Sequence, residues 1–144
     1  MRRLALLLFS LCLAVPALAA DAAKPERKEV FGDITVHYSV FNSTFVQPAT
    51  AQAAGLVRSK NQGVINITVL KGGKPAVANV SGTVSDLTSR QSNLSFKQVT
   101  DQGAVYYLAQ FPVEQEENRT FAISVGSGET NNSFSFTQTV FPGE

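Results

Sequence analysis

Apolar and polar residues alternate along much of this chain, and this period of two limits its fold more than any other feature. Over residues 34–40 every second residue is apolar, and Thr35, His37 and Ser39 stand between them. Successive side chains of a strand point to opposite faces, so this pattern predicts a half-buried strand. Similar short apolar patterns recur in six further segments, at residues 65–69, 80–84, 94–96, 105–111, 121–125 and 134–140.

Turn residues separate these segments, and they indicate how the strands connect. Lys71–Pro75 contains two glycines before a proline, Asp101–Gly103 has the form of a hairpin loop, and Gly126–Gly128 is a third turn. Seven short strands with regular turns and no long helix predict an all-β fold, an antiparallel immunoglobulin-like β-sandwich.

One segment leaves the strand pattern and predicts a short helix in the first inter-strand connection. Pro48 suits a first helical position, and Gly55 suits the left-handed residue just past the end. A helix this short does not hold in isolation, so we expect Phe45 and Leu56 to fix it against the sandwich. The helix would seal an open end or edge of the sheets, or else act as a lid over a binding site.

The N-terminus has the form of a secretory signal peptide. Arg2 and Arg3 precede an apolar run, and Ala17-Leu18-Ala19 provides a small-residue cleavage motif. We therefore predict a signal peptide over residues 1–19, a flexible leader over 20–32 and the β-sandwich domain over 33–142. The apolar run is shorter than a membrane-spanning helix, which favours a cleaved signal peptide over the alternative of an uncleaved anchor. No membrane span would remain after cleavage.

Composition excludes several classes of function. The single cysteine, Cys12, lies in the predicted signal peptide, so the secreted chain can form no disulfide and its core depends on burial alone. The net charge of the full chain is +1 and stays close to zero after cleavage. This near neutrality gives no electrostatic basis for a nucleic-acid or anionic-membrane partner.

The chain also lacks a recognisable catalytic or metal-binding constellation. His37 is the only histidine, and the alternation places it on the exposed side of its strand. No nucleophile elbow, zinc-ligand set, calcium loop or phosphate-binding loop occurs. We therefore expect no cofactor, no metal and no enzymatic activity, although a pair of carboxylates distant in sequence remains an open route to a hydrolase.

The two flanks of the predicted helix are the candidate partner-binding site. On the C-terminal flank, Arg58 and Lys60 would face the same side of an extended chain and could take a carboxylate from a partner. In the alternative interpretation this flank is a surface corner, with Arg58 paired to a neighbouring acid. The candidate residues are Phe41, Asn42, Thr44, Phe45, Arg58, Ser59, Lys60, Asn61 and Gln62.

Three stretches resemble a known family. Tyr38–Phe45, Gly55–Gly63 and Tyr106–Pro112 are similar to the signatures of domain of unknown function 4426, a family of small secreted proteins from gamma-proteobacteria such as Pseudomonas. The resemblance covers nearly the whole secreted chain and implies a periplasmic location. It implies no activity, cofactor or catalytic residue.

Three functional hypotheses follow. The leading one is a non-enzymatic periplasmic interaction module that binds an unidentified protein or envelope component through a loop end. The second is a small-ligand binder with a helix-lidded pocket, lined by Phe41, Phe45 and tyrosines. The third is a hydrolase that uses the distant carboxylates.

Overall fold

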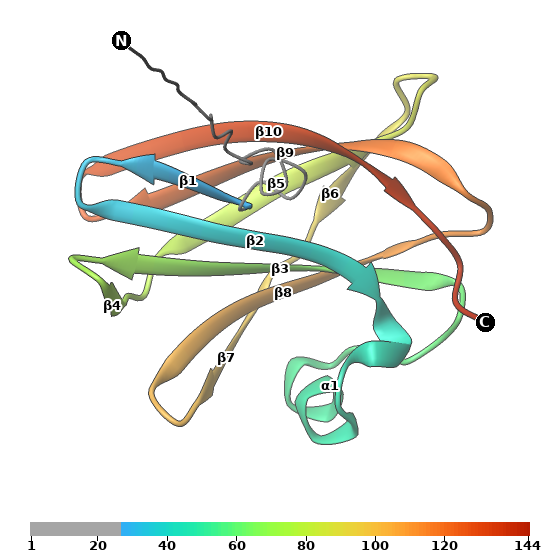
Figure 1. The fold of residues 1–144 in the computed structure, drawn as a ribbon, viewed down its shortest axis with the longest axis horizontal. Helices are drawn as coiled ribbons and strands as arrows, with labels where there is room; N and C mark the ends of the chain where they lie inside the picture. Colours follow the sequence, from blue (N-terminus) through green and yellow to red (C-terminus); the bar gives the residue numbers. More distant parts are fainter. Residues whose placement is uncertain (1–26) are drawn as a thin grey trace, which may run out of the picture.

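The protein is a sandwich of two antiparallel sheets, and the computed structural model describes residues 27–144 (Figure 1). The predicted signal peptide and residues 20–26 of the predicted leader lie outside the described residues. The first sheet has the order β1-β2-β3-β8-β7 with β4 paired to β3, and the second has the order β10-β9-β5-β6. The strands are β1 (Lys28–Phe31), β2 (Ile34–Asn42), β3 (Gln62–Lys71), β4 (Lys74–Pro75), β5 (Asn79–Ser85), β6 (Gln91–Leu94), β7 (Lys97–Asp101), β8 (Ala104–Pro112), β9 (Glu117–Ser127) and β10 (Thr130–Val140).

This architecture confirms the predicted all-β sandwich with one short helix, while its immunoglobulin-like character stays a prediction. The described residues form ten strands where the sequence indicates seven. The short β4 falls inside a predicted turn, and β1 falls inside the predicted leader. The last predicted turn also shifts slightly, because β9 continues to Ser127 and the reversal falls on Gly128 and Glu129.

The fourth predicted strand, at residues 94–96, is wrong in an informative way. Leu94 ends β6 in the second sheet, and β7 begins at Lys97 in the first sheet. Leu94 is buried in the core, and Phe96 packs against the same core. The two apolar residues therefore mark the segment where the chain crosses between the sheets, and not one continuous strand.

The sandwich begins earlier than predicted. Lys28–Phe31 forms β1 and pairs antiparallel with the first half of β2, in the register Lys28↔His37 to Phe31↔Ile34. The predicted leader over 20–32 is therefore too long at its C-terminal end. Its charged residues mask the strand, because only Val30 and Phe31 carry an apolar signal there.

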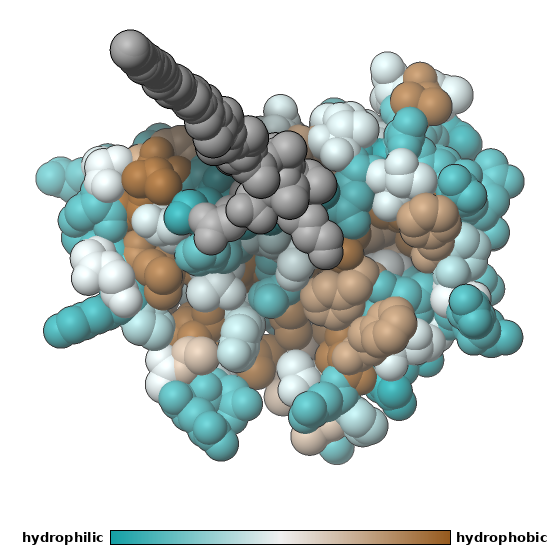
Figure 2. Space-filling model, in the orientation of Figure 1, coloured by the Kyte–Doolittle hydropathy of each residue, from teal (hydrophilic) through white to brown (hydrophobic). Residues whose placement is uncertain are grey.

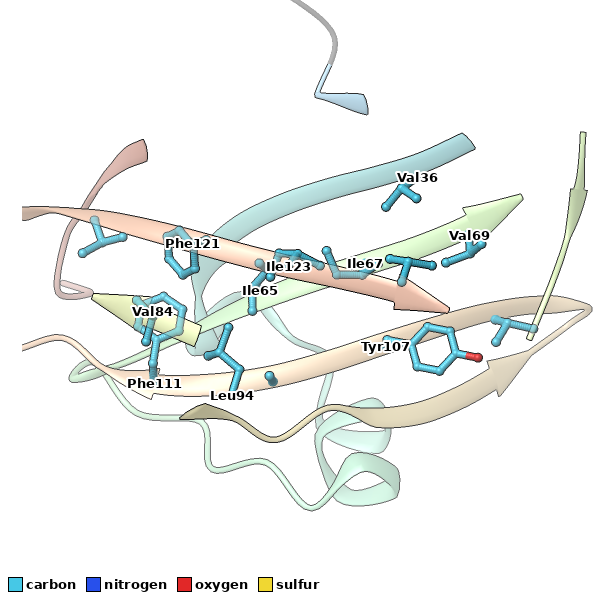
Figure 3. Packing of buried hydrophobic residues seen from close by; sticks show 14 of the residues in the cluster. Val36, Ile65, Ile67, Val69, Val84, Leu94, Tyr107, Phe111, Phe121 and Ile123 are labelled. Carbon is cyan, nitrogen blue, oxygen red and sulfur yellow. The ribbon is translucent and has the colours of Figure 1, made fainter. Parts of the chain in front are cut away.

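The core between the sheets is built from the inward rows of both (Figure 3). Phe111 and Phe121 meet edge to face at a centroid distance of 5.3 Å, and Phe121 stacks on Phe136 at 5.1 Å. Tyr38 stacks on Phe136 at 4.3 Å. These rings supply much of the volume of a core that, in the described residues, contains neither tryptophan nor cysteine.

The predicted helix is confirmed as α1 (Pro48–Ala54), with Gly55 in the left-handed conformation at φ 68°. Ala51 and Ala54 are buried in a second cluster with Val64 and Leu108, on the outer face of β3 and β8. The expected role of Phe45 is wrong, because its side chain is 78% exposed. The buried anchors are the helix alanines and Val46, together with the partly buried Leu56. Within residues 27–144, no helix has the length and hydropathy of a membrane span.

Candidate functional site

The first candidate flank is a 3-10 turn, Ser43–Phe45, that is capped by Asn42. Asn42 is buried, and its Oδ1 accepts hydrogen bonds from the backbone N–H of Thr44 at 3.0 Å and from the Thr44 hydroxyl at 2.8 Å. Its Nδ2 donates to the backbone oxygen of Lys60 at 2.9 Å. Both ends of the Asn42 amide are therefore engaged inside the protein, where they join the two flanks of the helix.

Ser43 is a site residue that sequence reasoning missed. It is fully buried, its hydroxyl donates to the backbone oxygen of Ser59, and it accepts from the Ser59 N–H, both at 2.9 Å. One side chain thus acts as a bridge between two backbone segments that lie far apart in sequence. The available signal was the Asn-Ser-Thr run, which is typical of a capped turn.

The second flank is also tied into the fold. Arg58 Nη2 donates to the backbone oxygen of Thr44 at 2.9 Å, so its partner is a carbonyl and not the predicted neighbouring acid. The backbone oxygen of Asn61 accepts a hydrogen bond from the backbone N–H of Val113 at 2.8 Å. The backbone oxygen of Lys60 accepts one from the backbone N–H of Gly143, also at 2.8 Å. Arg58, Lys60 and Asn61 are all exposed at the surface.

The structure therefore brings the two predicted flanks together, mainly through internal hydrogen bonds. Gln62 begins β3 and is half-buried. The backbone N–H and oxygen of Ser59 are both hydrogen-bonded to the Ser43 hydroxyl. These contacts support the interpretation of the polar residues as a surface corner. The apolar members of the candidate set, Phe41 and Phe45, belong to a different feature of the surface, a pocket.

That feature is an apolar pocket at one end of the sandwich, with a volume of about 490 Å³. It lies between the end of β2, the 3-10 turn and the segment that follows β10. Phe45, 78% exposed, and Phe141, 56% exposed, both line it. Its other lining residues are Val40, Phe41, Asn42, Thr44, Gly63, Phe111, Val113, Gln138, Thr139, Val140, Pro142, Gly143 and Glu144.

The position of this pocket corrects the hypothesis of a helix-lidded site. Phe41 and Phe45 do line it, but no residue of α1 and no tyrosine does. The wall opposite the 3-10 turn is instead the C-terminal segment after β10, which has no sequence signal of its own. In Figure 2 hydrophobic side chains are visible on this face where β2 leads into the 3-10 turn.

Side chains with acid–base or metal-binding chemistry do not gather at the pocket. His37 is exposed on β2, as predicted. No group of three or more His, Cys, Asp or Glu residues in the described part of the chain is arranged to hold a metal ion. Glu117, at the start of β9, forms an ion pair with Arg119 at 3.2 Å.

Within residues 27–144, Asp86 is the group with a marked pKa shift, and its role is local. Hydrogen bonds from the Thr88 hydroxyl and the Arg90 backbone N–H lower the pKa of Asp86 to about 2. The carboxylate closes the exposed turn between β5 and β6, and it also pairs with the Arg90 side chain at 3.1 Å. It is not a pocket residue, so its shift indicates a stabilised turn.

The fold and site together define a small two-sheet β-sandwich with an apolar pocket at one end. The model of the family described as domain of unknown function DUF4426 matches residues 28–143, and the chain belongs to this family. A crystal structure of a DUF4426 family protein from Pseudomonas aeruginosa PAO1 is similar, with 50% sequence identity and a TM-score of 0.79. That match covers 83% of this chain and 97% of the other.

Two structures of FetP from uropathogenic Escherichia coli strain F11 share the fold. One, expressed in the periplasm, has 10% identity and a TM-score of 0.59, and covers 81% of this chain and 94% of its own. The other, a copper-bound variant, has 11% identity and a TM-score of 0.58, with coverages of 81% and 90%. At these identities the likeness shows the fold alone. The comparison with curated proteins found no match.

Proposed function

We propose that this protein is a non-enzymatic periplasmic binding module, and that its end pocket holds an apolar group of a protein or envelope component. The observation that carries the proposal is the pocket itself, with Phe45 and Phe141 exposed at its rim. Exposed aromatic side chains beside a hydrophobic hollow are typical of surfaces that bind a partner. The pocket lies at a loop end of a rigid sandwich, where binding sites commonly occur.

The periplasmic location is supported by the sequence. The N-terminal pattern is that of a secretory signal peptide. The absence of cysteine after residue 12 is compatible with an oxidising compartment, since no disulfide can form or be mispaired.

We propose no copper site for this chain, although a variant of FetP was found copper-bound. Copper sites in proteins are built from imidazole, thiolate and thioether ligands. The whole chain has one His, one Cys and one Met, and the last two lie outside the described residues. The hollow beside His37 is lined by Arg27, Tyr38, Ser39, Asn66 and Thr68, none of which is such a ligand.

Titration with a neutral apolar fluorophore, N-phenyl-1-naphthylamine, tests the pocket directly. We expect Phe45→Ala and Phe141→Ala each to weaken binding about tenfold or more. If a ligand covers roughly 80 Å² of ring surface, the lost burial at ~25 cal/mol/Å² is about 2 kcal/mol. Both side chains are largely exposed, so neither change should affect folding.

Leu87→Ala is the matched control, because Leu87 is also 78% exposed but lies in the β5–β6 turn. Equal affinity in all four proteins, or no binding by wild type, would contradict the proposal. A photo-crosslinking amino acid at position 45 or 141 should then capture one defined periplasmic component, and the same group at 87 should not.

A free small ligand is the second candidate, since the pocket volume lies within the range of small-molecule sites. Native mass spectrometry of protein purified from the periplasm distinguishes the two. A co-purified small molecule that Phe141→Ala releases favours the ligand, while a crosslinked protein favours the module.

A further inference from the structure

The edge of the second sheet formed by β10 lacks the features that usually protect an edge strand. β10 has eleven residues, none of them charged and none proline, and its register with β9 is continuous over its whole length. Natural sheets protect edges with short strands, charged residues, proline or bulges. The other sheet edges follow this rule, because β1, β6 and β7 have only four or five residues each.

The geometry of the β9–β10 hairpin shows which backbone groups of β10 face outward. Ser127 and Thr130 flank a two-residue loop whose first residue, Gly128, has φ 63°. Such a loop is closed by a hydrogen-bonded pair, so even-numbered residues from Thr130 bond to β9. The odd-numbered residues therefore direct their N–H and C=O groups away from the sheet. No backbone hydrogen bond joins these outward groups to another residue in the range 27–144.

The sequence of β10 is symmetrical in chemical class about Ser135. Four of the five residues on each side have a counterpart of similar kind at the same distance on the other side, and the end residues Thr130 and Val140 do not match. The pairs are Phe134 with Phe136, Ser133 with Thr137, Asn132 with Gln138 and Asn131 with Thr139. An antiparallel strand of the same sequence, centred on Ser135, would thus place side chains of similar chemistry opposite one another.

We propose that β10 pairs with β10 of a second copy of this chain, antiparallel and centred on Ser135, to form one continuous sheet across a twofold dimer. In this register Ser135 lies opposite Ser135 of the other copy, and odd-numbered residues lie opposite odd-numbered residues. These are the residues whose N–H and C=O groups face outward, so they can form the hydrogen-bonded pairs. Aromatic side chains would pair across the strands on the inner face, and hydroxyl groups on the outer face.

Self-pairing is favoured over a foreign strand by this symmetry and by charge. An isologous interface requires a surface that complements itself. An edge strand with like charges would repel its own copy, and β10 carries none. Phe134 and Phe136 are only partly buried in the single chain, so the second copy would cover apolar surface that is already at the edge.

Cysteine crosslinking tests the register in the secreted form, which the sequence predicts to be free of cysteine. Ser135→Cys should give a disulfide-linked dimer on mild oxidation, because a hydrogen-bonded antiparallel pair has Cα atoms about 5.5 Å apart. Thr137→Cys alone should not crosslink, since its two copies would be about 14 Å apart at four residues of offset. A mixture of Ser133→Cys and Thr137→Cys proteins should crosslink to each other.

Light scattering after size exclusion provides the second readout. Wild type should be a dimer at about 100 μM, because dimerisation depends on protomer concentration. Ser135→Lys should be monomeric, because two lysines would meet at the twofold axis. Ser81→Lys is the control, since Ser81 lies exposed on the same sheet in the interior strand β5 and this variant should remain dimeric. A monomeric wild type, or equal crosslinking of the Ser135→Cys and Thr137→Cys variants, would overturn the proposal.

Discussion

Removal of the Ser43 hydroxyl should destabilise the whole domain, although Ser43 lies within the stretch that first suggested a binding site. In Ser43→Ala, the N–H and C=O of Ser59 lose their partner. A buried group left unpaired costs about 1–3 kcal/mol, and water can reach the half-buried Ser59 in part. We therefore expect the free energy of unfolding to fall by about 2–4 kcal/mol for the two groups together.

For a domain of this size, a loss of that order lowers Tm by about 10 °C. Thermal and urea unfolding followed by circular dichroism measure the change, and the m-value should stay constant if only stability is affected. Lys60→Ala is the control. The backbone oxygen of Lys60 carries its contacts and its side chain is exposed, so we expect a change within about 0.5 kcal/mol.

A Ser43→Ala protein with wild-type Tm would refute this reasoning. If it also lost binding to the end pocket, the polar residues around the 3-10 turn would have to be direct contacts to a partner. If stability falls and the residual folded protein still binds the fluorophore, the hydrogen bonds of Ser43 stabilise the fold and are not needed for binding.

Two further perturbations follow from the geometry. Gly63→Ala places a Cβ 2.6 Å from the Phe111 ring, so overpacking should lower the free energy of unfolding by about 1–3 kcal/mol. Urea unfolding measures this change, and unchanged stability would show that the ring has room to move. Asp86 has a pKa of about 2 in the folded state, below its ordinary 3.8. Its charged carboxylate therefore stabilises the β5–β6 turn above about pH 4, and this stabilisation is lost as the pH falls through 2. A carboxyl titration by NMR with a midpoint near the ordinary value would contradict that, and Asp86→Asn should abolish the pH dependence of the turn.

Much of the fold could be predicted because strands with one buried face repeat every two residues. The strands β2, β8 and β9 follow this rule closely, and the helix boundaries at Pro48 and Gly55 follow from backbone chemistry. The prediction failed where two structures share one local pattern. Leu94 and Phe96 alternate as in a strand, but they lie at a sheet crossing.

The candidate site was predictable as a region but not in its chemistry. Sequence reasoning identified the flanks of the helix, where Phe41 and Phe45 do line the pocket. It could not show that Asn42 is buried and joins the two flanks, because its partner Lys60 lies beyond the helix. It also assigned the lid to α1, since α1 is the irregular element, while the C-terminal segment that forms the opposite wall looks ordinary.

The sequence by itself determined the all-β class, the short helix and the dependence of the core on burial, because periodicity, proline, glycine and the lack of cysteine act locally. Only the tertiary structure decided what the stretch from Phe41 to Gln62 does. Its polar groups are satisfied partly across the helix, as in the Ser43–Ser59 bridge, and partly by distant segments, as where the backbone of Asn61 meets that of Val113. Phe41 and Phe45 line the end pocket together with the residues after β10, while the buried alanines of α1 pack on β3 and β8. Contacts of that kind depend on how the two sheets stack, which no local pattern encodes.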